Sequence, residues 1–364
     1  MTRSFPRIEV GGSSRDRGVQ YGEQAKAQIA AGVGIYRESF AKTGSDWSEA
    51  CELAQSFLAK VSDYDQDFLV EIEGIAAGAQ QPVAHIIILN ARTELQFWKN
   101  KVPGENLSAQ EECTAALAMP SATANGHLLH GQNWDWNPRC AESGVVLCIR
   151  SETGPDILTF VEAGQLARSG MNSAGIALTA NGLHSSIDYG RVGIPNPFMR
   201  RRLLMQDRLA PALYAVTSAD ISFSHFLLIS HAGGEAVGLE TTPEHVFWDQ
   251  PTDGVLTHAN HFKTPGALAQ LRDISFLRTP ETLYRDSRTA AILEQAKGQI
   301  SRETFIEAFS DTYGAPDSVL RSPAVRPGGV PSATVASIIM DTTDKKMWIS
   351  AAPYEGNEYV EYGF

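Results

Sequence analysis

Cys113 is the residue in this chain best suited to covalent chemistry. It opens a strand-like segment, Cys113-Thr114-Ala115, and Asn133-Trp134-Asp135 follows further along. A cysteine thiol titrates near 8.5, and a nearby amine or guanidinium increases its thiolate fraction. If the chain were cut before Cys113, the new α-amine would have a pKa of about 7.7 to 8.0, suited to a general base. One residue would then supply the nucleophile and the base of an acyl-thioester cycle.

Six short motifs accompany this cysteine in a fixed order along the chain. They are Glu73-Gly74-Ile75-Ala76 with Gly78, Leu89-Asn90-Ala91-Arg92-Thr93-Glu94, Gly131 to Asp135, Asn172-Ser173-Ala174-Gly175, Thr257-His258-Ala259-Asn260-His261 and Ser318-Val319-Leu320-Arg321. The ordered set resembles the acyl-CoA:isopenicillin N (6-aminopenicillanic acid) acyltransferase family, which belongs to the N-terminal-nucleophile hydrolases. The resemblance covers most of the chain. It implies that the precursor cuts itself between Glu112 and Cys113.

The resemblance also implies roles for three further residues. Asp135 would hold the α-amine of Cys113 with its carboxylate and face the developing oxyanion with its backbone N–H. The side-chain amide of Asn260 would complete that oxyanion hole, in which one donor is typically worth about a hundredfold to a thousandfold in rate. Arg321 would pair with Asp135. Taken singly, each residue also has an ordinary structural explanation: Asp135 could cap a helix or turn, Asn260 could be a hydrogen-bonded loop amide, and Arg321 could be a solvated charge.

Other residues of the motifs are candidates for substrate contact or for structural support. Asn181 and His184 fall where the family places pocket-lining loops, which makes them candidate substrate contacts. Trp134 and Trp136 are candidates for the pocket wall or the core. We also expect Arg92 and Glu94 to form an ion pair that braces the segment leading to the cut.

Two departures from the fungal members of the family matter for processing and location. Glu112 stands where the penicillin-pathway members have glycine, so cleavage here requires either a slower reaction or a pocket for a charged side chain. The C-terminus, Glu361-Tyr362-Gly363-Phe364, lacks a peroxisomal signal of the Ser-Lys-Leu type. A role in penicillin side-chain exchange is therefore disfavoured, and a relative acting on another small N-acyl compound is favoured.

The resemblance implies an α+β fold, the four-layer αββα sandwich of N-terminal-nucleophile hydrolases. Residues 1–112 would be a mostly helical pro-segment, or α-subunit, and residues 113–364 the β-subunit, both within one composite domain. The sequence supports the helical part, because Ser13 and Asp16 form a capping signal and an apolar stripe runs from Phe68 to Ala79. The stretch from Trp98 to Gln110 has loop composition, which suits a processing site.

After Cys113 the pattern changes to strands separated by turn signals. We predict hairpins from the paired segments Val145–Arg150 and Ile157–Val161, Phe226–Ile229 and Ala236–Leu239, and Val335–Met340 and Lys346–Ser350. Asn172 to Gly175 predicts a turn between strands. Helices are expected near Met199 to Val216 and Arg288 to Phe309.

Composition excludes several partners. With 42 acidic and 30 basic residues, the formal net charge is −12, and the one basic cluster, Arg200-Arg201-Arg202, most simply decorates a helix. Nucleic acid is therefore not an expected partner. The apolar runs are short and the N-terminus has no secretory h-region, so we expect a cytoplasmic protein with no membrane association.

The remaining cysteines and histidines suggest no metal or redox site. Cys51, Cys140 and Cys148 are too far apart for a Cys-x-x-Cys motif and are expected to be small core residues without disulfides. His258 and His261 are two metal-type ligands with no obvious third, so no metal is expected. No cofactor motif is present, and acyl-CoA is a candidate co-substrate by resemblance alone.

The sequence thus predicts a self-processed amidohydrolase or acyltransferase that acts on a small N-acyl amide, its two fragments remaining associated. One alternative is a dipeptidase or a hydrolase of the bile-salt or penicillin V acylase type with the same fold. Another is an uncleaved, inactive relative that binds a small amide. The acyl acceptor, the substrate and the oligomeric state stay open.

Overall fold

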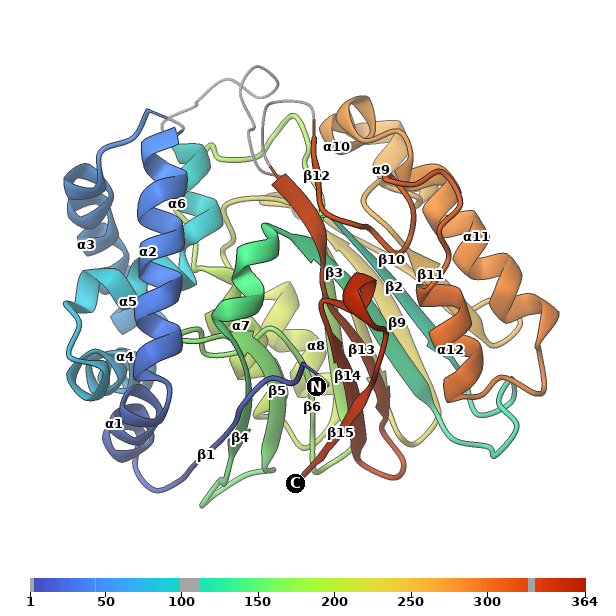
Figure 1. The fold of residues 1–364 in the computed structure, drawn as a ribbon, viewed down its shortest axis with the longest axis horizontal. Coiled ribbons are helices and arrows are strands. Elements are labelled where there is room, and N and C mark those ends of the chain that lie inside the picture. Colours follow the sequence, from blue (N-terminus) through green and yellow to red (C-terminus); the bar gives the residue numbers. More distant parts are fainter. Residues whose placement is uncertain (1–2, 43, 99–111, 327–330) are drawn as a thin grey trace.

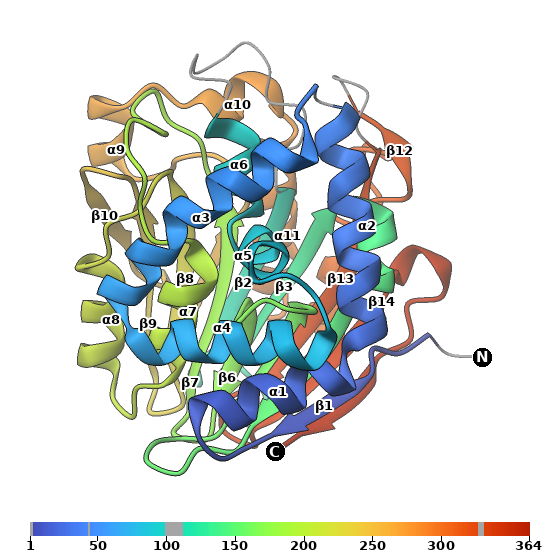
Figure 2. The same cartoon turned by 90° about the vertical axis from the view of Figure 1, so that its left-hand side faces the viewer.

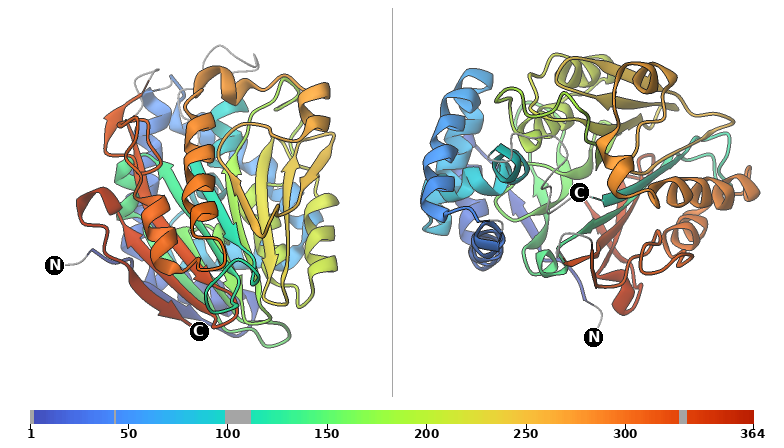
Figure 3. Two further views of the ribbon diagram at one scale, coloured as in Figure 1. Left: turned by 90° about the vertical axis from the view of Figure 1, so that its right-hand side faces the viewer. Right: turned by 90° about the horizontal axis from the view of Figure 1, so that it is seen from above.

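A computed structural model describes residues 3–42, 44–98, 112–326 and 331–364. Its strands form two sheets that face each other, and helices cover the outer face of each sheet (Figure 1). The view from above in Figure 3 shows the N-terminal helices on one side of the sheets and the helices near residues 280–310 on the other. The four-layer αββα sandwich is therefore confirmed.

The first layer is built from the N-terminal part of the chain, which is mostly helical as expected (Figure 2). An N-terminal strand that the sequence did not predict, β1 (Arg7–Val10), precedes these helices. The helices are α1 (Ser14–Gln24), α2 (Lys26–Lys42), α3 (Trp47–Tyr64), α4 (Gln66–Ala79), α5 (Val83–Asn90) and α6 (Arg92–Trp98). The predicted cap is present, because the side chain of Ser13 accepts a hydrogen bond from the backbone N–H of Asp16.

The sheet next to these helices, sheet A, has the strand order β1-β4-β5-β6-β7-β8-β9-β10. Apart from β1, which pairs parallel to β4, its neighbours are antiparallel. Its other strands are β4 (Gly144–Ile149), β5 (Ile157–Glu162), β6 (Ser169–Asn172), β7 (Ile176–Gly182), β8 (His225–His231), β9 (Glu235–Thr241) and β10 (Val246–Asp249).

The second sheet, sheet B, has the order β11-β2-β3-β13-β14-β15, with the short β12 paired to β13. Cys113 lies in its strand β2, between β11 and β3. The strands are β2 (Glu112–Ala118), β3 (Leu129–Trp136), β11 (Val255–His258), β12 (Ala324–Val325), β13 (Pro331–Asp341), β14 (Lys346–Ala351) and β15 (Val360–Gly363).

The helices after β7 complete the sandwich. They are α7 (Asn196–Leu204), α8 (Leu209–Thr217), α9 (Pro265–Gln270), α10 (Ile274–Arg278), α11 (Thr282–Gln295) and α12 (Arg302–Phe309), with 3-10 turns at Pro138–Glu142 and Pro353–Glu355. Helices α11 and α12 pack on the outer face of sheet B. Alternate residues of β2 therefore contact different layers: Ala116 packs with Phe305 of α12, whereas Ala115 and Leu117 pack with the strands of sheet A.

All three predicted hairpins are confirmed as the antiparallel pairs β4–β5, β8–β9 and β13–β14. The turn at Asn172 is confirmed too, since Gly175 has a φ of +97° and donates its N–H to the Asn172 carbonyl. Each of the two long helical stretches is instead a pair of helices, α7 with α8 and α11 with α12. Local composition predicted the helices but not the breaks between them.

The prediction that the arginine triplet decorates a helix surface is wrong for two of its members. The triplet lies in α7, but Arg200 and Arg201 are buried. Arg201 pairs with Glu71 at 3.2 Å, while Arg202 pairs with Asp65 at 2.9 Å and is partly exposed. The triplet is therefore part of the packing between α7 and the N-terminal helices.

Within the described residues, no single helix has the length and apolar composition needed to cross a membrane. Helices α4 and α5 pass that test only as a pair, bent by 117° at their junction.

Four glycines bring α1 and α4 into close contact: Gly18, Gly22, Gly74 and Gly78. A Cβ added to Gly78 would lie 2.2 Å from the Val19 carbonyl oxygen, and one added to Gly18 would lie 2.3 Å from the Glu71 carbonyl oxygen. These separations are far below van der Waals contact, so the helices can pack this closely only without side chains there. This packing gives a physical reason for the glycines in the Gly-Ile-Ala-x-Gly motif.

We therefore expect Gly78→Ala to destabilise the protein by about 2 kcal/mol or more, because the backbone of α1 must move away. The matched control is Gly34→Ala in the middle of α2, where an added Cβ meets nothing within 4 Å. That change should be neutral or stabilising by about 0.5 to 1 kcal/mol, since alanine favours helix more than glycine does. Urea unfolding of both variants checks this. Equal changes in the free energy of unfolding for Gly78→Ala and Gly34→Ala would contradict the close-packing explanation.

Candidate functional site

Cys113 is fully buried, and side chains from distant segments fix both of its backbone polar groups. Its N–H donates to Oδ1 of Asn260 at 2.8 Å, and its carbonyl accepts from Nη1 of Arg285 at 2.9 Å. Its cross-strand partner on β3 is Trp134. By the alternation along β2, its side chain faces sheet A, as those of Ala115 and Leu117 do.

The position of Asn260 follows from the register of β11. Strand β11 pairs with β2 so that His258 lies opposite Ala115. Continuing this antiparallel register for two residues places Asn260 opposite Cys113. Because β11 ends at His258, the side chain of Asn260 accepts the hydrogen bond that a strand carbonyl would otherwise take. This geometry explains why an asparagine stands two residues after the strand.

The side-chain amide of Asn260 is oriented by several partners. Its Oδ1 also accepts from Nη2 of Arg285 at 2.9 Å, and its Nδ2 donates to the Gly182 carbonyl at 3.0 Å. One end of the Asn260 amide faces two hydrogen-bond donors and the other end faces a carbonyl acceptor. The first end must therefore be the oxygen and the second the nitrogen. An amide nitrogen carries two N–H donors, so the bond to Gly182 is chemically compatible with a second bond to an oxyanion.

Next to Cys113, the buried guanidinium of Arg321 holds three carboxylates. They belong to Glu112 on β2, Asp135 on β3 and Glu281 just before α11. Nε of Arg321 lies 3.3 Å from Oδ2 of Asp135, and its Nη2 lies 3.0 Å from Oε1 of Glu281. The shortest contact of the three joins Nη1 to the Glu112 carboxylate. The three acids come from separate elements, so Arg321 ties them together at one point.

The carboxylate of Asp135 is held on its other side by Thr334, whose Oγ1 donates to Oδ1 at 2.7 Å. Burial raises the pKa of Asp135 to about 6, against the lowering effect of Arg321, Arg285 and the Thr334 hydrogen bond. The negative charge of Glu112 raises this pKa further. Loss of Glu112 from the cluster would therefore make Asp135 more acidic.

The two arginines of the site respond differently to their surroundings. Burial opposes the charge of Arg321, but the carboxylates of Glu112, Asp135 and Glu281 outweigh it and raise the pKa of that guanidinium. Burial and the neighbouring charge of Arg321 lower the pKa of Arg285. Arg321 is therefore the firmly protonated centre of the cluster.

The sequence predicts a pocket for Glu112 as one way to accommodate a charged residue before the cut. The structure provides this pocket, formed by Arg321 and by the hydroxyl of Ser332, which lies 3.4 Å from the Glu112 carboxylate. Glu112 is buried and continues β2 directly into Cys113. The stretch Trp98 to Gln110, predicted to be a loop before the cut, lies outside the described residues except for Trp98, which ends α6.

Of the four predicted catalytic residues, the structure joins Cys113 to Asn260 and Asp135 to Arg321. Arg285 bonds to both members of the first pair and Glu281 pairs with Arg321 of the second, and sequence reasoning missed both. Thr282, Arg285 and Thr289 are buried polar residues at positions i, i+3 and i+7 of α11, so they share one helix face. A polar stripe where an apolar one is expected was the signal that could have identified Arg285.

Three of the four candidate substrate contacts are buried and contact neighbouring residues. Trp134 is buried, with the guanidinium carbon of Arg168 4.0 Å from its ring centroid. Trp136 donates its indole N–H to the Tyr36 hydroxyl at 3.0 Å. Asn181 donates to the carbonyls of His258 and Ala259 at 2.7 and 3.0 Å, so it supports the segment that carries Asn260.

His184, the fourth candidate substrate contact, lies among aromatic side chains. Its ring stacks near Tyr189 and Phe223, and its Nδ1 lies 3.8 Å from the Asp188 carboxylate. Arg92, predicted to pair with Glu94, instead pairs with Glu162 at 2.8 Å, because residues two apart on a helix do not face each other.

The remaining histidines and cysteines have structural surroundings. His258 pairs with Glu240 at 3.1 Å, and His261 contacts Thr282 at 3.0 Å. The residues 3–42, 44–98, 112–326 and 331–364 contain one group that could hold a metal ion: His127, Asp341 and Asp344. It lies at the end of β3 far from Asp135.

All four cysteines lie in described residues and none forms a disulfide; Cys140 and Cys148 are buried and Cys51 is partly buried.

Two sequence comparisons relate this chain to a known family. The model of the family "Acyl-coenzyme A:6-aminopenicillanic acid acyl-transferase" matches residues 121–353, a range that contains Asp135, Asn260 and Arg321 and begins after Cys113. The acyl-coenzyme A:6-aminopenicillanic-acid-acyltransferase 40 kDa form of Emericella nidulans is 29% identical over 343 residues, 92% of this chain and 89% of that protein.

One solved structure shows this fold at low sequence identity. A variant of the conjugated bile acid hydrolase from Clostridium perfringens superimposes with a TM-score of 0.51 and 14% identity, covering 69% of this chain and 92% of that one. The penicillin V acylase from Agrobacterium tumefaciens gives a TM-score of 0.43 and 14% identity, with 66% and 83% covered. The fold is the αββα sandwich of the N-terminal-nucleophile hydrolases, and the chain belongs to the acyl-coenzyme A:6-aminopenicillanic acid acyl-transferase family.

Proposed function

We propose that this protein cuts its own chain between Glu112 and Cys113 and then uses Cys113 as an N-terminal nucleophile on small N-acyl amides. The observation that carries the proposal is the environment of the Glu112–Cys113 bond. Asn260 and Arg285 hold the backbone of Cys113, and Arg321 holds the side chain of Glu112. The bond is thus fixed from both sides in a buried site, as positioned chemistry requires.

The self-cleavage is an N-to-S acyl shift followed by hydrolysis. The thiol sulfur of Cys113 bonds to the carbonyl carbon of Glu112, the C–N bond breaks, and the nitrogen takes a proton to become an amine. Water then attacks the thioester and releases residue 112 as a new carboxyl terminus. The N–H of Cys113 points to Asn260, so the carbonyl of the same trans peptide, that of Glu112, points the opposite way; we assign the oxyanion of both steps to the backbone N–H of Asp135, which lies opposite Glu112 on β3. The side-chain amide nitrogen of Asn260 is assigned to the oxyanion formed in turnover.

Charge balance within the cluster favours this outcome. The uncut site holds two guanidiniums, Arg285 and Arg321, and three carboxylates, Glu112, Asp135 and Glu281. When Glu112 leaves after cleavage, two cations face two carboxylates, and the new amine of Cys113 lies beside Asp135. The departure of Glu112 also lowers the pKa of Asp135. The side chain of Asp135 is then an ionised carboxylate, which can accept a hydrogen bond from the amine.

In turnover, the amine of Cys113 takes the thiol proton, the thiolate attacks the substrate carbonyl, and the leaving amine takes that proton. The acyl thioester then passes to water or to another acceptor. Acyl-CoA as an acyl donor is the variant suggested by the family description. Asp135 and Arg321 are positioning residues in this scheme, since they act through the amine.

A second candidate, an uncleaved binding protein, is favoured by one observation. Glu112 is well accommodated as part of β2, so the uncut chain has a complete charge cluster of its own. This candidate predicts an intact chain and no thiol-dependent acyl intermediate.

The denatured mass of the purified protein separates the two candidates. We expect fragments of 112 and 252 residues (364 less 112) from the wild type and an intact chain from Cys113→Ala. An Asn260→Asp variant tests the oxyanion role of Asn260 in turnover, because it keeps an oxygen for the N–H of Cys113 and loses the amide donor. Its kcat for a small N-acyl amide should fall by about a hundredfold to a thousandfold. An intact wild-type chain would support the binding protein instead.

Arg321→Gln, made in the Cys113→Ala background so that every sample is uncut, should destabilise the protein by about 3 to 5 kcal/mol at pH 7.5, because buried carboxylates lose their cation. The loss should shrink towards pH 5. Burial raises the pKa of Asp135 and the charge of Arg321 lowers it. Without Arg321, the pKa of Asp135 in the native state therefore rises further above its value in the unfolded state. Such a group stabilises the fold below its unfolded pKa, and this stabilisation is lost as pH rises through the native pKa.

Urea unfolding between pH 5 and pH 8 measures this effect. Arg208→Gln is the control, because Arg208 pairs with Asp207 on the surface, where both side chains are exposed. It should unfold like its parent at every pH. A loss for Arg321→Gln that does not change with pH would show that the carboxylates do not depend on this cation.

A further inference from the structure

Arg285 of α11 is fully buried, and its guanidinium donates hydrogen bonds to three oxygen atoms around the nucleophile. Nη1 donates to the Cys113 carbonyl at 2.9 Å and to Oγ1 of Thr114 at 3.0 Å. Nη2 donates to Oδ1 of Asn260 at 2.9 Å. One side chain thus holds the nucleophile, the residue after it and the amide to which we assign the oxyanion of turnover.

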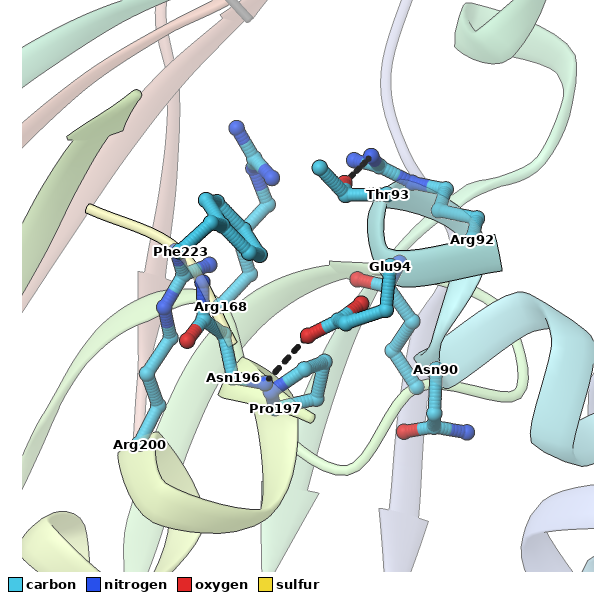
Figure 4. A pocket seen from close by; sticks show the side chains of 10 residues that line it. Asn90, Arg92, Thr93, Glu94, Arg168, Asn196, Pro197, Arg200 and Phe223 are labelled. Carbon is cyan, nitrogen blue, oxygen red and sulfur yellow. Dashed lines mark hydrogen bonds between the residues drawn. The ribbon is translucent and has the colours of Figure 1, made fainter. Parts of the chain in front are cut away.

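The three acceptors of Arg285 are neutral, whereas two other buried arginines pair directly with carboxylates. Arg321 holds three of them, and Arg92 pairs with Glu162 at 2.8 Å. Figure 4 shows Arg92 at the edge of a pocket, with its hydrogen bond to Thr93. A buried cation gains less from neutral oxygens than from a carboxylate partner. A role in the site therefore explains the position of Arg285 better than a contribution to stability does.

The bonds of Arg285 matter most once the chain has been cut before Cys113. In the uncut chain the N–H and the carbonyl of Cys113 bind Asn260 and Arg285, side chains that take both bonds because β11 ends at His258. Cleavage turns this N–H into the amine of a chain end, and chain ends are poorly ordered unless they are tied down. The bond from Arg285 to the carbonyl involves no atom that the cut changes, so it still ties down the new N-terminus.

Arg285 also acts on the side-chain amide of Asn260. Before the cut, Oδ1 of Asn260 accepts hydrogen bonds from the N–H of Cys113 and from Arg285. In turnover the amine of Cys113 takes and gives a proton, whereas the guanidinium keeps its donors throughout. Arg285 therefore fixes the oxygen end of the amide, and with it the nitrogen end. Its charge also polarises the amide, because a hydrogen bond from a charged donor is stronger than one from a neutral donor.

We propose that Arg285 is a positioning residue for turnover and contributes much less to the self-cleavage. After the cut it holds Cys113 by the carbonyl and orients the amide of Asn260. During the self-cleavage Cys113 still lies within an unbroken strand, and the oxyanion is assigned to the N–H of Asp135 on β3. The inference rests on the proposed function of Cys113.

The charge of Arg285 provides a readout that a merely structural role would not change. A nearby cation disfavours protonation of the amine of Cys113, which acts as the base in turnover. Removing this cation makes protonation easier, so the acid limb of the pH profile should move to higher pH. The other ionisable groups around Cys113 and Arg285 are Asp135, Glu281, Arg321 and His261.

Arg285→Gln and Arg285→Lys test the proposal in the full chain. N-hexanoyl-glycine is the probe for kcat, KM and the pH profile, and denatured mass after cell-free synthesis follows the self-cleavage. Arg285→Gln should lower kcat by about a hundredfold with KM nearly unchanged, and should slow the self-cleavage by less than about tenfold. Its acid limb should lie higher by about one pH unit.

Arg285→Lys keeps the charge but not the forked donors, so it should keep the acid limb of the wild type and only part of kcat. Arg288→Gln is the matched control, because Arg288 lies one turn further along α11, is exposed and binds Asp311 at 2.9 Å. It should leave kcat, KM, the acid limb and the self-cleavage unchanged. Urea unfolding of each variant checks that it is folded.

The outcomes separate this inference from the proposed function. A fall in kcat with nearly normal self-cleavage supports the inference. Equal losses of both reactions in Arg285→Gln and Arg285→Lys, or a wild-type kcat in Arg285→Gln, would overturn it alone. If Arg285→Gln does not fold, Arg285→Lys decides: reduced kcat with normal self-cleavage supports the inference and a wild-type kcat overturns it. An intact wild-type chain contradicts the proposed function and this inference with it.

Discussion

The buried guanidinium of Arg321 is the constraint on which the proposed site depends. A cation with no exposed surface is stable only when acids and hydrogen-bond acceptors surround it. Here the acids come from β2, β3 and the residue before α11, so satisfying one charge brings three elements together. One of these acids is the residue that precedes Cys113. The requirement to neutralise Arg321 therefore also fixes the bond that we propose is cut.

Sheet geometry supplies the rest of the site. Asn260 meets Cys113 although 147 residues separate them, because it continues the register of β11 beside β2. Arg285 reaches the same point from α11, which packs on the outer face of sheet B. The side chain of Cys113 faces the other way, towards sheet A. Arg285 and the thiol of Cys113 thus lie on opposite sides of sheet B.

Much of this arrangement could be predicted from the sequence. The turn chemistry at Asn172 and the hairpin patterns identified strands correctly, because both signals are local. The ordered motifs identified the family and brought Asp135 and Arg321 together. The sequence could not predict that Arg285 enters the site or that Arg200 and Arg201 are buried. The partners of Arg285 are Cys113 and Asn260, and that of Arg201 is Glu71; all three lie in other segments of the chain. Helical periodicity alone does not distinguish a buried arginine with a partner from a solvated one.

The most direct test of Cys113 as the nucleophile is to locate the acyl group during turnover. The wild-type protein would be mixed with N-hexanoyl-glycine, quenched in acid within seconds and analysed by denatured mass and peptide mapping. If Cys113 is the nucleophile, a hexanoyl group should be found on the fragment that begins with Cys113, attached at Cys113 and released by neutral hydroxylamine, as a thioester is. Product formation with the acyl group on another residue, or with Cys113 replaced by alanine, would contradict it.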